Sequence, residues 1–483
     1  MRRRRTGGGT WRAGVLAAAL VLTGAAAAAG ASRPVPGSAS RGHDGLTRPL
    51  VGAYYYMWNP ENLIAGGSLR QQLVPSQEPP FALIDSNRTS TATHDIANAH
   101  KAGIDFFAID WWPYDPAFSG RNYLTADAAM KEFLAAPDLR EMKFAMFYET
   151  WNLGFDGGNE STPISVQAEL HFDSDMLALA KAYFATPSYL HIEGRPVVYL
   201  YLTRTLTGDV AGMIGGARTY LEQHGYADPF FIGDEVYWRV TPQIQVPNAP
   251  VFTGLPQLGR IDQFDAVTSY TLYYGDPQQA NGPASDSSGY PGTTRIAADQ
   301  RFLLALYRNA TSNKVPVLPV VQPGFNDRGF RLSTNHPAQP RQWLAGDGPS
   351  STLDQMLRCV AIPEVDPALP IVMVTSWDDW NEDTGIEPIP GTPTTSDDSP
   401  SGTAYTQGYR YGGEGTSEVR TLAGDVKLLD HASRTVRSAG RLRHRGWAVG
   451  SLERRPSDRQ GAKRMGIFLV SAGSVELALF TMT

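Results

Sequence analysis

The sequence predicts an α/β fold, a (β/α)8 barrel, for the greater part of the chain. From residue 49 onward, eight short apolar runs rich in Val, Ile, Phe and Tyr recur, and segments with helical character separate them. Runs that are apolar at nearly every position are typical of strands buried on both faces, as in a parallel sheet covered by helices. Eight strand–helix units in succession favour closure into a barrel.

The order of elements follows from these runs. We expect strands at residues 51–56, 104–110, 144–149, 196–201, 230–234, 266–270, 315–321 and 371–377. We expect helices between them at residues 93–102, 126–136, 173–185, 210–223 and 297–311. An open, doubly wound sheet is the main alternative. It is less favoured because no glycine-rich phosphate-binding turn follows the first strand.

The first 31 residues have the features of a secretion signal. Four consecutive Arg occupy positions 2–5, residues 13–29 are apolar, and small residues at 29–31 resemble a signal peptidase site. A retained anchor is the alternative, because the apolar stretch is nearly long enough to span a bilayer. We expect cleavage, a linker at residues 32–48, no stable membrane insertion afterwards, and a secreted, extracellular protein.

Charge and cysteine content exclude several classes of protein. The net charge is −6, but residues 1–31 hold five Arg and no acid, and residues 431–483 hold ten Lys and Arg against three acids. The intervening chain is therefore strongly acidic, which excludes nucleic acid as a partner. Cys359 is the one cysteine, so intramolecular disulfides and Cys-based metal clusters are excluded. The nine His are scattered, and we expect no metal ion and no cofactor.

Acidic and aromatic residues stand where the expected strands end. They are Tyr55, Tyr56, Trp58, Asp110, Trp111, Trp112, Glu149, Trp151, Tyr270 and Trp377. In a barrel these ends converge on one face. Carboxylates there supply acid, base or nucleophile, and aromatic rings cover sugar rings, which indicates a glycoside-cleaving site. Each residue also has a structural alternative, since a Trp can belong to the core and an Asp can cap a helix.

The segment after the eighth strand, residues 376–388, reads SWDDWNEDTGIEP. Asp379 and Glu382 stand three residues apart, which places both side chains on one face if the segment is helical. Two carboxyls so placed can have different pKa values and divide the roles of acid and base or nucleophile. Alternatively, Asp378 or Asp379 caps a helix and Glu382 is a solvated neighbour.

Six motifs in order resemble glycoside hydrolase family 99, the endo-α-mannosidases and endo-α-mannanases, and the wider group of family-99-like barrels. They are YYYMW at 54–58, AGIDFFAIDWW at 102–112, FYE at 147–149, GRPVVYLY at 194–201, PGFNDRGFR at 323–331 and SWDDWNEDTGIEP. The resemblance covers roughly residues 49–390. It implies a single catalytic domain, which we place at residues 49–430. Residues 434–464 are basic and show no clear helical period, so we expect residues 431–483 to form a basic tail that is disordered or loosely attached, with a small domain as the alternative.

The resemblance also implies roles for particular residues. Glu382 matches the general acid, and Asp379 stands where that family has the Glu that assists attack by the sugar 2-hydroxyl, with retention through a 1,2-anhydro sugar. Glu149 matches a residue that contacts substrate, and Asp327 and Arg331 match polar positions of the seventh-strand loop. The chain departs from the family pattern at Asp378, Asp379, Asn381, Asp383 and the pair Thr150-Trp151.

The shorter Asp379 retracts its carboxylate by roughly 1.5 Å relative to Glu, so the stereochemical outcome stays open. The α-1,3-glucanases of glycoside hydrolase family 71, which invert configuration, have an Asp-x-x-Glu similar to Asp379 and Glu382. Because the rest of the chain is more similar to family 99, we expect a monomeric endo-α-mannosidase acting on a polysaccharide or oligosaccharide. The alternatives are an inverting α-1,3-glucanase-like hydrolase, a sugar-binding barrel without catalysis, and a glycan-assembly protein.

Overall fold

A computed structural model shows how the chain folds. It describes residues 48–60, 74–112, 126–153, 163–235, 258–270, 293–327, 341, 351–391, 393, 414–444, 448–451, 464–471 and 474–481. The expected signal at residues 1–31 and all but the last residue of the linker lie outside these ranges. No helix in the described ranges combines the length and the apolar character needed to cross a bilayer.

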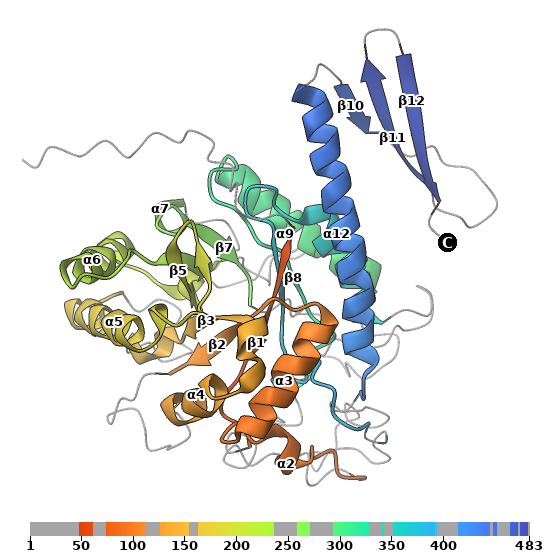
Figure 1. Ribbon diagram of the computed structural model, residues 1–483. Coiled ribbons are helices and arrows are strands. Elements are labelled where there is room, and N and C mark those ends of the chain that lie inside the picture. The colour runs from red at the N-terminus through yellow and green to blue at the C-terminus, as the bar shows by residue number, and fades with distance from the viewer. Residues whose placement is uncertain are drawn as a thin grey trace, which may run out of the picture. The chain divides into compact units, whose positions relative to one another are not determined.

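Eight parallel strands form the barrel (Figure 1), and the predicted fold is confirmed. The strands are β1 (Leu50–Tyr55), β2 (Phe106–Trp111), β3 (Lys143–Tyr148), β5 (Arg195–Leu200), β6 (Phe230–Asp234), β7 (Ala266–Thr268), β8 (Val320–Val321) and β9 (Ile371–Val374). They pair in the order β7-β6-β5-β3-β2-β1-β9-β8. A parallel bridge between Val267 and Val317 joins the two ends of this order. A short strand, β4 (His191–Ile192), pairs antiparallel with β5.

Helices occupy the connections, including all five that the sequence predicts. They are α2 (Phe81–Ile84), α3 (Thr89–Ala102), α4 (Ala126–Leu134), α5 (Val166–Leu179), α6 (Val210–Gln223), α7 (Leu258–Ile261), α9 (Thr293–Ala310), α10 (Thr352–Met356), α11 (Ile362–Glu364) and α12 (Ser417–His444). The helix α6 begins where Asp209 accepts a 2.7 Å hydrogen bond from the Gly212 backbone N–H. The helix α3 ends at Gly103, whose φ of 87° favours glycine.

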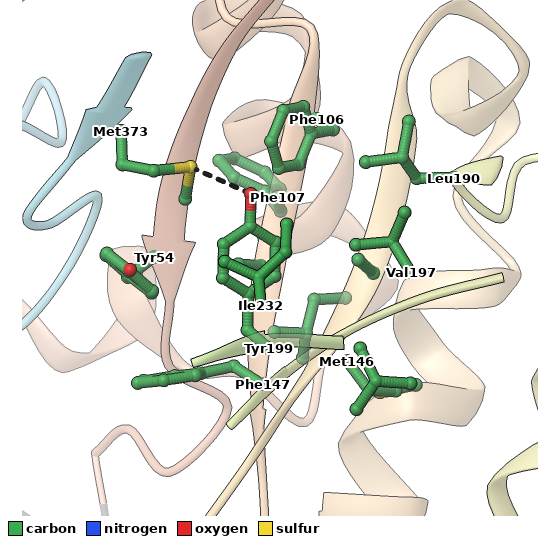
Figure 2. Packing of buried hydrophobic residues seen from close by; sticks show 14 of the residues in the cluster. Tyr54, Phe106, Phe107, Met146, Phe147, Leu190, Val197, Tyr199, Ile232 and Met373 are labelled. Carbon is green, nitrogen blue, oxygen red and sulfur yellow. Dashed lines mark hydrogen bonds between the residues drawn. The ribbon is translucent and has the colours of Figure 1, made fainter. Parts of the chain in front are cut away.

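Aromatic side chains fill the interior of the barrel (Figure 2). The ring centroid of Tyr54 lies 4.7 Å from that of Phe147, and the Tyr199 hydroxyl lies 3.2 Å from the Met373 sulfur. Gly52 makes room for this packing, because a Cβ there would lie 2.3 Å from Phe106 Cζ. Since successive side chains of a strand point to opposite faces, residues two apart on β1 enter the interior and their neighbours face the helices.

The C-terminal region contains one long helix and a small sheet. Leu422, Val426 and Leu429 of α12 belong to the barrel's hydrophobic core, so the helix completes the domain. The expected domain boundary after residue 430 falls inside α12. Strands β10 (Ala448–Ser451), β11 (Arg464–Ser471) and β12 (Ser474–Thr481) form an antiparallel sheet in the segment expected to be disordered. The expectation of disorder followed from the basic charge and missing helical period of residues 434–464, whereas β11 and β12 lie at and beyond the end of that stretch.

Candidate active site

Carboxyl groups from three connections meet at the carboxyl ends of the strands. Asp110 is near the end of β2, Glu149 follows β3, and Asp379 and Glu382 lie in the loop after β9. Asp110 and Glu149 share a hydrogen bond, the charge of Asp379 acts on Asp110, and the charge of Glu382 acts on Glu149. The barrel thus brings together four of the five acids that the sequence predicts as site residues; the fifth is Asp327.

Asp379 is held in place by three hydrogen-bond donors. Its Oδ1 accepts from the backbone N–H groups of Asn381 and Glu382, each at 3.1 Å, and its Oδ2 accepts from the Tyr270 hydroxyl at 3.1 Å. The Asp379 backbone N–H in turn donates to the Ser376 hydroxyl at 2.8 Å. The carboxylate therefore caps its own turn, as one of the structural alternatives proposed, while Tyr270 orients it at the cluster.

Asp110 and Glu149 form a buried pair that holds a proton. Burial raises the pKa of Asp110 to about 8, and the hydrogen bonds from Glu149 and Trp112 oppose this rise. Burial, followed by the charge of Asp110, raises the pKa of Glu149 well above its ordinary value. A hydrogen bond between two carboxyls requires a proton on one of them, so the pair is protonated at least once at neutral pH.

Tyrosine rings line the same end of the barrel. Tyr56 stacks on the half-buried Trp58, with ring centroids 4.3 Å apart, and meets Tyr270 edge to face at 6.3 Å. Tyr201, at the end of β5, packs against Tyr270 at 5.4 Å and feels the charges of Glu149 and Glu382. Sequence reasoning missed Tyr201 as a site residue, although it follows the β5 run directly, as Tyr56 follows that of β1.

Three of the expected site residues lie among core side chains instead. Tyr55 stacks on Phe107 at 4.6 Å and donates to Asp95 of α3 at 3.0 Å, so it faces the helices. Trp111 packs against Tyr148 at 6.0 Å on the same outer side. Trp377 is fully buried and contacts Phe107. The sequence grouped these residues with the cleft because it ignored the alternation of faces along a strand.

The remaining expected residues have varied placements. Trp112 donates to Asp110 at 2.8 Å and so belongs to the acidic cluster. Asp327 is buried, and its neighbour Asn326 donates through its backbone N–H to the Glu382 carbonyl at 2.8 Å. Trp151 lies in a 3₁₀ turn, Thr150–Leu153, and its side chain is outside the described part, as is Arg331.

Two further acids near the strand ends are bound to arginines. Asp234, the last residue of β6, forms an ion pair with Arg204 and accepts the Tyr270 backbone N–H at 3.0 Å. Both oxygens of Glu235 accept from Arg260, at 2.7 and 2.8 Å. Arg204 and Arg260 therefore offset the charges of these two acids within the fold, although the charge of Asp234 still contributes to the raised pKa of Glu149.

Comparison with known proteins gives a family and a fold. The family model described as Glycosyltransferase WbsX matches residues 70–392. No curated protein matches the chain. The structure is similar to the family 99 endo-α-mannosidase of Bacteroides thetaiotaomicron in complex with BIS-TRIS-propane. The TM-score is 0.52 at 16% identity, over 81% of this chain and 98% of that one. A glycoside hydrolase-like protein has a TM-score of 0.51 at 16% identity, over 78% and 94% of the two chains.

Proposed function

The chain belongs to the family described as Glycosyltransferase WbsX, and from this premise we propose that it is a secreted glycoside hydrolase that cleaves internal α-mannosidic bonds of mannan or mannose-containing glycans. The observation that carries the proposal is the cluster of Asp110, Glu149, Asp379 and Glu382 beside tyrosine rings at the carboxyl ends of the strands. The family 99 likeness in sequence motifs and in fold supports the choice of α-mannosides.

In the proposed reaction, Glu382 donates a proton to the leaving glycosidic oxygen. It is the more accessible of the two acids after β9, since Asp379 is buried and Glu382 is half-buried. Asp379 accepts the proton of the attacking hydroxyl. In an inverting reaction the attacking group is a water molecule, which displaces the leaving sugar directly. In a retaining reaction it is the sugar's own 2-hydroxyl, which displaces the leaving sugar and forms a 1,2-anhydro sugar. Water then opens that ring at C1 while Glu382 takes the proton of the water and Asp379 returns its proton to the 2-oxygen. A separation of about 6.5 to 9.5 Å between the two carboxyls suits inversion, and about 5 to 5.5 Å suits retention through a direct carboxylate nucleophile.

The other groups bind and orient the sugar. The protonated Asp110–Glu149 pair can accept hydrogen bonds from sugar hydroxyls through the carboxyl lone pairs that the bond between the two acids does not use. The half-buried Trp58, which stacks on the buried Tyr56, offers a flat surface for the apolar face of a pyranose ring. Tyr270 keeps Asp379 in a fixed orientation, which favours catalysis because the reacting groups must be aligned.

The family's description names a transferase, but two features favour hydrolysis. A transferase that uses an activated sugar donor has to hold negatively charged phosphates. The cluster is instead acidic, and Arg204, whose charge reaches this region, is already paired with Asp234. The export signal expected at residues 1–31 would also remove the protein from cytoplasmic donors. Sequencing the mature N-terminus of protein recovered from the culture medium tests that signal.

The test of the hydrolase is the substitution Glu382→Gln. We expect it to reduce release of oligosaccharide from α-mannan by at least 100-fold, because a general acid contributes about 10²- to 10⁴-fold. The matched control is Glu222→Gln, which makes the same change at an exposed carboxyl on α6, an element that carries none of the four clustered acids. NMR of the first product anomer on a panel of α-mannan, yeast mannan and α-1,3-glucan reports substrate and stereochemistry together. Unchanged turnover by Glu382→Gln would rule out its role as the acid.

A sugar-binding barrel without catalysis is the second candidate. It is favoured by the three donors that engage Asp379, since a carboxylate used as a cap has less freedom to act as a base. A binder would bind oligosaccharides from the same panel but release none of them. Calorimetry and product analysis on one protein preparation therefore separate the two candidates.

A further inference from the structure

A histidine and two acids meet on the helix side of the sheet, on the opposite face from the acidic cluster. His94 and Asp95 lie on α3, and Glu387 lies in the loop after β9. One side-chain ligand atom from each residue lies within 4.8 Å of the other two. The distance along the chain between α3 and Glu387 explains why no metal-ligand spacing is visible in the sequence.

Each of the two carboxyls has one oxygen with an assigned N–H or O–H donor and a second oxygen without one, and the two carboxyls also share a hydrogen bond with each other. Asp95 Oδ2 accepts from the Tyr55 hydroxyl at 3.0 Å, and Glu387 Oε2 accepts from Trp380 Nε1 at 3.2 Å. The second oxygens, Asp95 Oδ1 and Glu387 Oε1, are buried and have no assigned N–H or O–H donor among the described residues. The residues are only 1% and 5% exposed. Burying such oxygens costs free energy unless a proton or a cation lies between them.

We propose that His94, Asp95 and Glu387 bind a divalent metal ion, with Zn²⁺ the best match to the donor set. One imidazole nitrogen and two carboxylate oxygens are common zinc ligands, and with bonds of about 2.0 to 2.1 Å the ligand atoms of a tetrahedral site lie about 3.3 Å apart. His94 Nδ1 lies 3.5 Å from Asp95 Oδ1, which is close to that spacing. The His94 side chain is 44% exposed, so an ion can reach the buried oxygens from solvent.

The metal site would fasten the loop after β9 to α3. That loop carries Asp379 and Glu382 beside Asp110 and Glu149, and Glu387 beside His94 and Asp95 of α3. Asp378, also in this loop, accepts a hydrogen bond from the Tyr56 backbone N–H at 2.8 Å, and the charge of Asp95 acts on it. An ion between α3 and the loop would offset this accumulation of buried negative charge. The proposal concerns a different face of the barrel and does not depend on the proposed hydrolysis.

The rival explanation needs no ion. The hydrogen bond between Asp95 and Glu387 requires a proton on one of them, as in the Asp110–Glu149 pair, and that proton alone could satisfy both second oxygens. His94 would then act only as a hydrogen-bonded counter-charge to Asp95. The two explanations differ in a measurable way, because a shared proton predicts no stoichiometric metal binding, whereas a three-ligand site predicts one that requires the imidazole.

Equilibrium dialysis of tag-free, chelator-treated protein against Zn²⁺, followed by metal analysis and thermal unfolding, tests the proposal. We expect one tightly bound Zn²⁺ per chain in the wild type and a higher Tm with the metal than without it. The substitution His94→Ala, at a half-exposed position, should weaken binding at least 10-fold and abolish the Tm rise. Glu387→Gln, which keeps an acceptor for Trp380, should do the same.

The matched control is His100→Ala, which removes an exposed histidine from the same helix and should leave binding unchanged. Two results would overturn the proposal. One is wild-type protein that retains no Zn²⁺ after dialysis. The other is equal Zn²⁺ content and equal Tm shift in the wild type and in His94→Ala.

Discussion

Neighbouring residues at the strand ends have opposite surroundings. Asp110 faces the barrel interior and Trp111 faces the helices, where it packs on Tyr148. Tyr56 lies at the acidic cluster, whereas Tyr55 donates to Asp95 of α3. Because the side chains of a strand alternate between its faces, a shift of one residue moves a group from the site to the core. The chemistry of this site therefore depends on the register of each strand.

The buried proton of Asp110 predicts a pH-dependent stability. The folded protein keeps this proton to about pH 8, whereas the unfolded chain releases it near pH 4. Between those values the folded state binds more protons, so the free energy of unfolding falls as pH rises, by up to about 1.4 kcal/mol per pH unit for each retained proton. The isosteric Asp110→Asn removes one titrating group and should flatten this dependence.

Urea denaturation at pH 5 and at pH 7.5 measures the effect. Wild-type protein should be more stable at pH 5, and Asp110→Asn should show a smaller difference between the two pH values. Asp262→Asn, at an exposed position, is the control and should behave as the wild type does. The same pH dependence in Asp110→Asn and in the wild type would contradict the assignment of the proton to this pair.

At the level of elements, side chains of β2 and β9 pack directly against the backbone of β1 inside the barrel. Gly52 on β1 faces Phe106 of β2 and Met373 of β9, and a Cβ would lie 2.3 Å from the ring and 2.8 Å from the sulfur. Phe106 also stacks on Tyr199 across the barrel at 6.3 Å. Its ring therefore has neighbours on both sides and has little room to move away from an added methyl group.

Gly52→Ala should accordingly destabilise the protein by about 1 to 3 kcal/mol, the usual cost of overpacking a core. Gly215→Ala is the matched control, since Gly215 lies at an exposed position inside α6 with no atom within 4 Å of an added Cβ. It should stabilise the protein by about 0.4 to 1 kcal/mol, because alanine restricts the unfolded chain. Equal changes in the urea midpoint for the two variants would show that the contact at Gly52 is not tight.

At the level of the whole molecule, a helix from the far end of the chain completes the core. Val426 of α12 lies against Gly103, and Arg341 connects α12 to the loop after β9. Its Nη2 donates to the Asp383 and Gly385 carbonyls at 2.8 Å, and its Nη1 lies 3.8 Å from Glu418. The loop that carries Asp379 and Glu382 is thus braced by the C-terminal region.

Truncation tests this dependence on α12. A chain that ends at residue 416 lacks Leu422, Val426 and Leu429 and should lose cooperative unfolding or unfold at least 10 °C lower, since three buried apolar side chains are removed. A chain that ends at residue 444 keeps the whole of α12 and should unfold as the full chain does. An unchanged Tm in the shorter chain would show that α12 contributes little to the core.

Much of the fold was predictable because its signals are local. The run 230–234 matches β6 and the pattern at 210–223 matches α6, each at both ends. The prediction for 315–321 was less accurate, since the ladder there is limited to β8 and one bridge at Val317. Strand ladders of this kind depend on the neighbouring strand, which a local pattern does not contain.

The residues alone established the eight strands, the helices between them and the acids at the strand ends, because burial on both faces leaves continuous apolar runs that can be counted. The folded chain was needed for everything that depends on which side a residue faces and on what lies next to it. In the folded chain Asp110 and Trp111 point to opposite faces of the sheet, and Asp110 shares a proton with Glu149. The fold also places His94 and Asp95 beside Glu387. These are contacts between distant segments, and their geometry arises only when the barrel brings those segments together.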